Sequence, residues 1–226
     1  MNQSSEKEFS KIFCIIPAFV IAVNFLVIAV LVALGWPEWW KNINYELSEL
    51  TWFSSLQLAF IGASAFQNFV ALKLTDPNSP SILRRNLWLL LGMGFFFLSV
   101  DEAFQIHERL REGVFKPHNI GTNLPGIGPG DFLLVVYAIV GLFIAYHLFK
   151  LIRTTPIALR WFVSAVLLSV VMVLVDAADP TGRSVIHQRI EQFIEEIIET
   201  LAQMCFLISF LTFYLSTLKK AFVEKT

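Results

Sequence analysis

The chain has few cysteines and few charged residues, and each of these features excludes certain classes of protein and of functional site. Among 226 residues only Cys14 and Cys205 are cysteines, and both fall inside apolar runs, where we expect them to act as small buried hydrophobes. A thiolate metal site is therefore excluded. Charged residues make up 15% of the chain, against about 25% in soluble domains, which excludes a soluble enzyme core. The net charge of −1 offers no basic surface for a nucleic acid.

Apolar residues are abundant and come in long runs. They make up 56% of the chain, with 22 Phe and 6 Trp, and the mean hydropathy is +0.64. Each run is long enough to cross about 30 Å of hydrocarbon at about 1.5 Å per residue. The sequence predicts an all-α polytopic membrane protein, one domain over 1–226 forming a six-transmembrane helix bundle with spans near 9–35, 47–72, 87–106, 132–152, 157–178 and 193–217.

The basic residues predict how the bundle is oriented. The two ends of the chain and the second and fourth loops hold 11 of the 17 Lys and Arg residues. By the positive-inside rule both termini are cytoplasmic, which fits a multi-pass protein of a bacterial-type inner (plasma) membrane. With that orientation 14 of the 18 acidic residues fall on the extracytoplasmic side. We therefore expect the polar chemistry of the protein at that face.

The third span ends in a group of ionisable residues, Asp101, Glu102, His107 and Glu108. Two carboxylates directly after an apolar run are costly near the membrane boundary. The helix dipole also disfavours negative charge at a C-terminal end. An ordinary solvated helix exit is the alternative, and it explains Glu108 better than Asp101 and Glu102. In a regular helix His107 would point about 100° away from Glu108.

The fifth span and the start of the sixth add further candidates. Asp176 closes the fifth span, again against the helix dipole. His187, Glu191, Glu195 and Glu199 then recur at four-residue intervals, on the side opposite an isoleucine-rich stripe. An amphipathic helix lying at the membrane interface is the alternative, although such helices favour Lys and Arg over Glu.

Polar residues also follow one face of the second span. Glu46 lies at its outer end, where a simple N-terminal helix charge is an adequate explanation. Gln57, Ser64 and Asn68 continue on the same face, so Glu46 would begin an internal polar track. The loop 113–130, rich in Pro and Gly, is either a lid over this end or a plain surface loop.

Carboxylates converging from several helices need a cation among them. Oxygen-rich ligation with one or two histidines suits Fe, Mn or Zn, so a divalent metal is the expected cofactor. No Glu-x-x-His pair, the usual element of dinuclear bundle sites, occurs among these helices. The predicted catalytic residues are Asp101, Glu102 and Glu195, and the predicted metal ligands are Glu46, Asp101, His107, Glu108, Asp176, His187, Glu191 and Glu195.

Three functions remain open from the sequence. The first is a membrane metalloenzyme, a hydrolase or oxidoreductase, acting on a lipid or another apolar substrate at the outer leaflet. The second is a transporter or partner subunit whose acids titrate or bind protons or cations. The third is a structural or assembly role without a site. A transporter needs polar groups through the whole bilayer, and among the spans only the second shows them, which favours the enzyme.

Overall fold

The computed structural model describes residues 3–44, 47–75, 82–118, 120, 132–176 and 184–224, which form helices joined by turns and loops. Six of these helices are long and apolar enough to cross a membrane, which confirms the predicted all-α six-span bundle. They are α1 (Gln3–Gly35), α2 (Glu49–Thr75), α3 (Ile82–Phe104), α5 (Phe132–Ile152), α6 (Pro156–Asp176) and α7 (Val185–Glu224).

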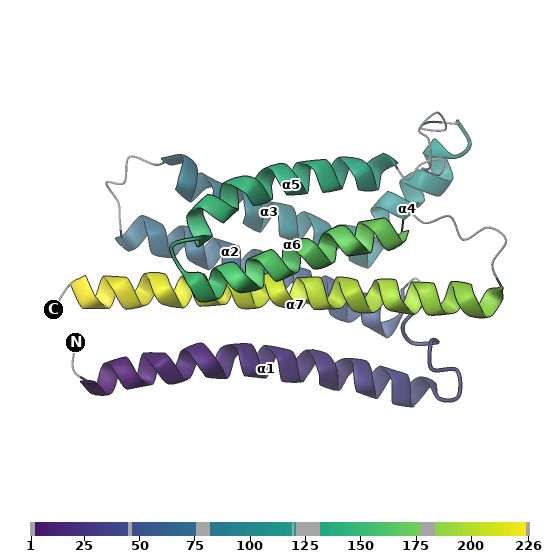
Figure 1. The fold of residues 1–226 in the computed structure, drawn as a ribbon. Coiled ribbons are helices and arrows are strands. Elements are labelled where there is room, and N and C mark those ends of the chain that lie inside the picture. The colour runs from purple at the N-terminus through teal and green to yellow at the C-terminus, as the bar shows by residue number, and fades with distance from the viewer. Residues whose placement is uncertain are drawn as a thin grey trace.

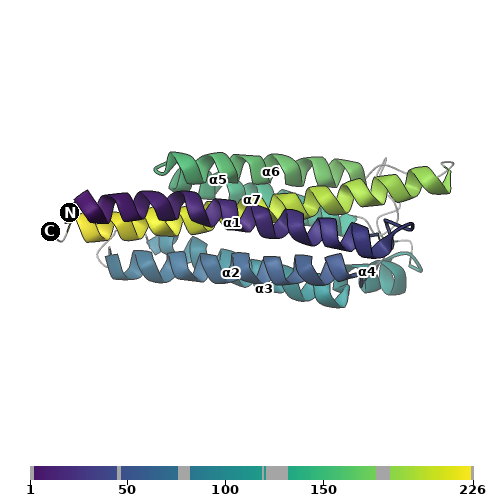
Figure 2. The same ribbon diagram turned by 90° about the horizontal axis from the view of Figure 1, so that it is seen from below.

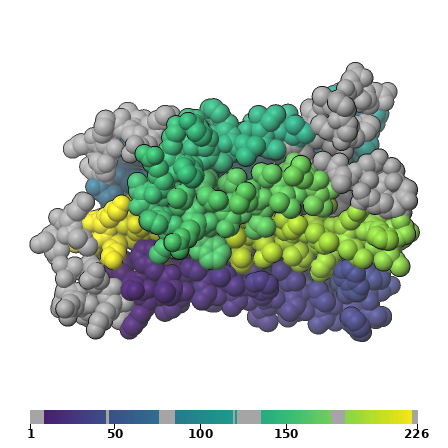
Figure 3. Space-filling view, in the orientation of Figure 1, coloured from purple at the N-terminus to yellow at the C-terminus, as the bar shows by residue number. Residues whose placement is uncertain are grey.

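Helix α7 is the centre of the bundle (Figures 1 and 2). It packs against α6 on one side and α2 on the other, while α3 lies along α2 and α5 along α6. Helix α1 covers a further side of α7 as one continuous row (Figure 3). The helices near the centre are also the most buried. Half of the apolar stretch of α2 and of α7 is buried, but only 11% of that of α1 and of α5. The chain ends lie together at one end of the bundle, opposite the start of α7 (Figure 1).

Aromatic side chains fill the space between α3, α6 and α7. The Trp88 ring meets Phe210 at 5.0 Å between centroids, and Phe95 meets Phe206 at 5.7 Å. Phe162 from α6 reaches Phe206 at 6.0 Å. Lipid tails are as apolar as these rings, so packing contacts of this kind, rather than exclusion of water, hold membrane helices together.

Two segments differ from a simple reading of the apolar runs. The third span ends at Phe104, because Gln105 adopts a left-handed backbone with φ of 53° and the chain restarts as α4 (Ile106–Leu110). A π-helical turn, Arg111–Phe115, follows α4. It occupies the start of the loop predicted as a lid, while residue 119 and residues 121–130 of that loop lie outside the described residues.

Two glycines allow α2 and α3 to approach closely. A Cβ atom at Gly92 would lie 2.9 Å from the ring of Phe66, and one at Gly62 would lie 3.0 Å from the ring of Phe96. Small residues at such crossings are typical of membrane helix pairs. We expect Gly92→Ala to lower the free energy of unfolding by about 1–3 kcal/mol, because ring and helix must separate. Thermal unfolding in detergent measures the change.

Gly94 provides the matched control on the same helix. No atom lies within 4 Å of a Cβ built at Gly94, so Gly94→Ala meets no steric resistance. It also removes a flexible helix residue, and we expect stability to be unchanged or raised by up to about 1 kcal/mol. Equal destabilisation by Gly92→Ala and Gly94→Ala would contradict the close packing of α2 on α3.

Candidate functional site

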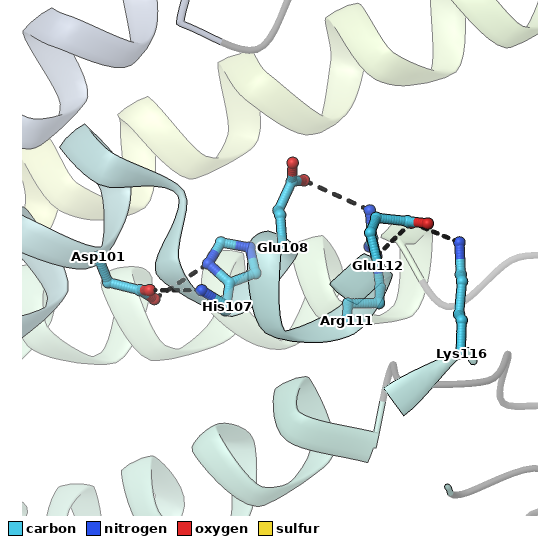
Figure 4. Close-up of polar contacts among 6 residues, drawn as sticks. All are labelled: Asp101, His107, Glu108, Arg111, Glu112 and Lys116. Atoms are coloured by element: carbon cyan, nitrogen blue, oxygen red, sulfur yellow. Dashed lines mark hydrogen bonds and ion pairs between the residues drawn. The ribbon is translucent and has the colours of Figure 1, made fainter. Parts of the chain in front are cut away.

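The break after α3 joins Asp101 to His107. Asp101 is 4% exposed, and its Oδ1 accepts a hydrogen bond from the His107 backbone N–H at 2.8 Å. Its Oδ2 lies 3.0 Å from Nδ1 of the His107 ring (Figure 4). A continuous helix would have turned His107 away, so the left-handed residue Gln105 is what makes this pair. Because Nδ1 contacts Asp101, Nε2 is the ring nitrogen that does not face this carboxylate.

The Asp101 contact also sets the titration of His107. The hydrogen bond to Asp101 raises the pKa of His107 above its ordinary value of 6.5, and the negative charge of Asp101 adds to the rise, while burial opposes it. The contact therefore stabilises the fold fully below about pH 6.5, and this contribution is lost as the pH rises through the raised pKa.

His107→Gln is accordingly expected to lower stability in a pH-dependent way. The loss relative to the parent protein should be about 1–2 kcal/mol near pH 5.5 and should shrink at higher pH, because neutral His107 makes a weaker hydrogen bond. Thermal unfolding at several pH values checks this. His118→Gln is the control, since exposed His118 contacts the Val114 carbonyl and, among the described residues, no carboxylate. A loss independent of pH would contradict an ionised pair.

Beyond this pair, α4 and the π-helical turn carry a surface row of charges. Glu108 Oε1 lies 3.5 Å from Nη2 of Arg111, and Glu112 pairs with both Arg111 and Lys116 (Figure 4). The hydrogen bond from Lys116 holds the pKa of Glu112 below its ordinary value. The exposed pair of Lys116 and Glu112 adds little to stability. Glu108 is thus engaged by a basic neighbour at the edge of the site.

The charges of three glutamates act on one another, and we call these residues the acid cluster: Glu102 of α3 with Glu196 and Glu199 of α7. All three are partly buried. The charges that act most strongly on Glu102 and Glu196 are those of other carboxyl groups. Like charges held together in a poorly solvated place require either protons or a cation. This arrangement is the chemically costly feature of the molecule.

Neutral polar side chains form hydrogen bonds with the carboxyl groups of the acid cluster. The Ser54 hydroxyl hydrogen-bonds the Glu102 carboxyl. The Gln203 amide donates from Nε2 to Ser54 Oγ at 2.6 Å and to Glu199 Oε1 at 2.9 Å. Ser54 lies five residues inside α2, about 7–8 Å from its first residue, so this end of the bundle is polar well below the helix ends.

A line of buried polar groups continues inward between α2 and α7, and we call it the α2–α7 seam. Gln57 Nε2 donates to the Thr200 carbonyl at 3.4 Å, and Asn68 Nδ2 donates to the Phe210 carbonyl at 3.0 Å. From Ser54 to Asn68 the seam runs about 21 Å along α2, most of the thickness of the hydrocarbon. Of the polar track predicted on α2, Gln57 and Asn68 therefore donate to backbone carbonyls of α7, whereas Ser64 donates to the Phe60 carbonyl of its own helix. The Gln203 side chain of α7 contacts Ser54, which the predicted track did not include.

The remaining predicted site residues are distributed as follows. Glu46 lies outside the described residues, and Asp176 ends α6 with a side chain that is not described. His187 is exposed near the start of α7, where its backbone N–H and ring contact Ser184 Oγ, 12 residues and about 18 Å from Glu199. Glu191 and Glu195 are partly buried, and Glu195 acts electrostatically on Glu196. Within the described ranges no three His, Cys, Asp or Glu side chains are arranged to hold a metal ion.

Glu196 is the site residue that the sequence analysis missed. In the sequence, the four-residue series His187, Glu191, Glu195 and Glu199 follows one side of the helix and predicts the site there. Glu196, Glu199 and Gln203 form another series at spacings of three and four residues, which also shares one helix face. This series continues into the apolar part of the sixth span and ends at Gln203. A polar residue at that position in the sequence was the signal that could have identified the face of the helix that carries Glu196.

Fold and site together define a multi-pass membrane protein, a six-helix bundle with acidic groups gathered near one end and a polar seam leading inward. The chain belongs to the family described as Domain of unknown function (DUF8692), whose model matches residues 13–216, most of its length. No curated protein and no solved structure matches it.

Proposed function

We propose that this protein binds protons at the acid cluster and passes them along the α2–α7 seam, as a proton-translocating or proton-coupled membrane protein. The observation that carries the proposal is the hydrogen-bonded chain from Glu102 through Ser54 and Gln203 to Glu199 at one end of a buried polar line, where the charge of Glu196 also acts on Glu102. Ionisable groups inside membrane bundles mark proton and ion pathways. Polar groups in the sequence continue inward on α2 alone, which favours an enzyme, but the contacts of α2 with the Gln203 side chain and with the Thr200 and Phe210 carbonyls of α7 support a path.

Protons fit the donor set better than a transition metal does. Immediately around the acid cluster stand a serine hydroxyl and a glutamine amide, and both hydrogen-bond carboxyl groups. Such groups stabilise either form of a carboxyl, because a hydroxyl can donate or accept. A proton exchanged among three carboxyls needs no fixed coordination geometry, whereas Zn, Fe and Mn demand one.

The proposed sidedness places the acid cluster near the extracytoplasmic face of an inner membrane. It rests on the 11-to-6 division of basic residues, together with chain ends that lie at the same end of the bundle. Reporter domains fused after residue 120 should then be active outside the cell, and those fused after residue 80 inside. The reverse pattern would turn the acid cluster toward the cytoplasm.

Proteoliposomes test the proposed activity. Purified protein is reconstituted in vesicles carrying an internal pH dye, and a potassium diffusion potential provides the driving force. The proposal predicts acidification of the lumen that depends on both the protein and the potential. The proposal would be overturned if the protein caused no change in the internal pH at either polarity of the potential, with or without added sodium or potassium.

A metalloenzyme is the second candidate, and the Asp101–His107 pair favours it. Histidines that bind metals commonly hold their other ring nitrogen against a carboxylate, as His107 does with Asp101. The substrate would be a membrane lipid or another apolar molecule at the outer leaflet. Elemental analysis of protein purified without chelator decides: about one or two equivalents of Fe, Mn or Zn, lost in Asp101→Ala, would favour the enzyme.

A further inference from the structure

Three buried amide oxygens on the α2–α7 seam have no hydrogen-bond partner among the described residues. They are Gln57 Oε1, Gln203 Oε1 and Asn68 Oδ1, on side chains that are at most 4% exposed. A buried amide oxygen left without a donor costs about 1–3 kcal/mol. Inside a membrane no bulk water is at hand to reduce that cost. Three such atoms on one seam point to a bound hydrogen-bond donor.

The hydrogen bonds of these amides fix which atom is the oxygen. Asn68 Nδ2 donates to two carbonyls, of Ser64 and Phe210, each at 3.0 Å. Gln203 Nε2 lies between Glu199 Oε1 and Ser54 Oγ. Turning the Asn68 amide over would set oxygen against both carbonyls. Turning that of Gln203 would set oxygen against the oxygen of Ser54, whose hydroxyl hydrogen is donated to Glu102. The unpartnered atoms are therefore true acceptors, and that of Gln203 lies beside the acid cluster.

At the inner level of the seam an unpartnered donor accompanies the acceptor. Trp88 is fully buried, and its Nε1 has no partner among the residues described. The Trp88 ring contacts the Phe210 ring at 5.0 Å, and the Phe210 carbonyl receives the Asn68 amide. A ligand that reaches both groups must accept from an indole N–H and donate to an amide oxygen. Water does both, whereas a metal cation could bind the amide oxygen but would be repelled by the indole N–H.

We propose that ordered water molecules bind the α2–α7 seam at two levels. The outer level is formed by Gln203 Oε1 and Gln57 Oε1 next to the acid cluster, and the inner level by Asn68 Oδ1 and Trp88 Nε1. Buried waters typically make about three hydrogen bonds to polar groups that otherwise lack partners. Their role rests on the proposed function: these waters extend the proton path from Glu102 toward the opposite end of the bundle.

Solid-state NMR of the protein in lipid nanodiscs tests the binding of water directly. Indole-labelled protein gives six tryptophan N–H signals, and Trp88→Phe identifies that of Trp88. We expect magnetisation to pass from water to the Trp88 N–H and to the Asn68 side-chain amide, and the transfer to Trp88 to disappear in Asn68→Leu. No transfer to either group in the parent protein would overturn the proposal. This result is read from the parent protein, and Trp88→Phe serves only to assign the Trp88 signal.

Proton flux through proteoliposomes then tests the role of the waters. Asn68→Leu and Gln57→Leu should lose most of the flux, because apolar side chains of similar size displace water. Ser209→Ala is the matched control and should retain it, since the hydroxyl of this buried serine of α7 donates to the Ala158 carbonyl of α6, outside the α2–α7 seam. Full flux in folded Asn68→Leu would refute the path, even if Glu102 is essential. A hydrated seam in a protein without flux would refute the proposed function and leave the water sites standing.

Discussion

Glu102→Gln is expected to abolish proton flux through reconstituted vesicles while leaving the bundle folded. Glutamine has nearly the shape of glutamate and can still receive the hydrogen bond from Ser54, but it cannot give up or take a proton. Glu199→Gln should act in the same way, because the Gln203 amide can donate to either side chain. The measurement is the initial rate of the internal pH change at a fixed potential.

Glu112→Gln is the control for this experiment. Glu112 is an acid near the same end of the bundle, but it is exposed and paired with Lys116. Its variant should retain the flux of the parent protein. Residues that serve one path are not additive, so Glu102→Gln combined with Glu199→Gln should be no worse than either alone. Folded Glu102→Gln protein that still carries full flux would remove the acid cluster from the path.

Asp101→Ala is expected to be the most damaging change for stability. It leaves the His107 backbone N–H and ring without the carboxylate that receives both, and it removes the contact that holds the α3–α4 break. Losing a buried acceptor with two donors should cost about 2–4 kcal/mol. Asp101→Asn should cost less, because an amide oxygen still accepts from the backbone N–H. Thermal unfolding in detergent compares the variants.

Glu38→Ala is the corresponding control, an exposed acid in the turn after α1. It should leave the melting temperature unchanged, since exposed substitutions away from special contacts are near neutral. A melting temperature of Asp101→Ala equal to that of the parent protein would show that the Asp101–His107 contact does not hold the helix break together.

The overall fold follows from the sequence because hydrophobic length is a property of single segments. Runs such as 132–152 need only be long and apolar to form spans, and α5 (Phe132–Ile152) has those bounds. Asp101 and Glu102 could be predicted as site residues for a related reason. Charged residues at the end of an apolar run can be recognised in the sequence without knowing how the helices pack.

The details of the site depend on geometry that a helical wheel does not contain. One left-handed residue, Gln105, brings His107 onto Asp101, and nothing about a glutamine requires a positive φ. The choice between Glu195 and Glu196 depends on the rotation of α7 against α2 and α3, where a turn of about 100° decides which side chain enters the bundle. That rotation is fixed by tertiary packing, including the contact of Gln203 with Ser54.

Infrared spectroscopy of the protein in lipid tests the central claim most directly. If the acid cluster carries protons, the spectrum at neutral pH contains the band of protonated carboxylic acids. That band should lose intensity in Glu102→Gln and shift on exchange into deuterated buffer. Carboxyl groups that are all ionised, together with a stoichiometric metal in the purified protein, would contradict the proton-path account and favour the metalloenzyme.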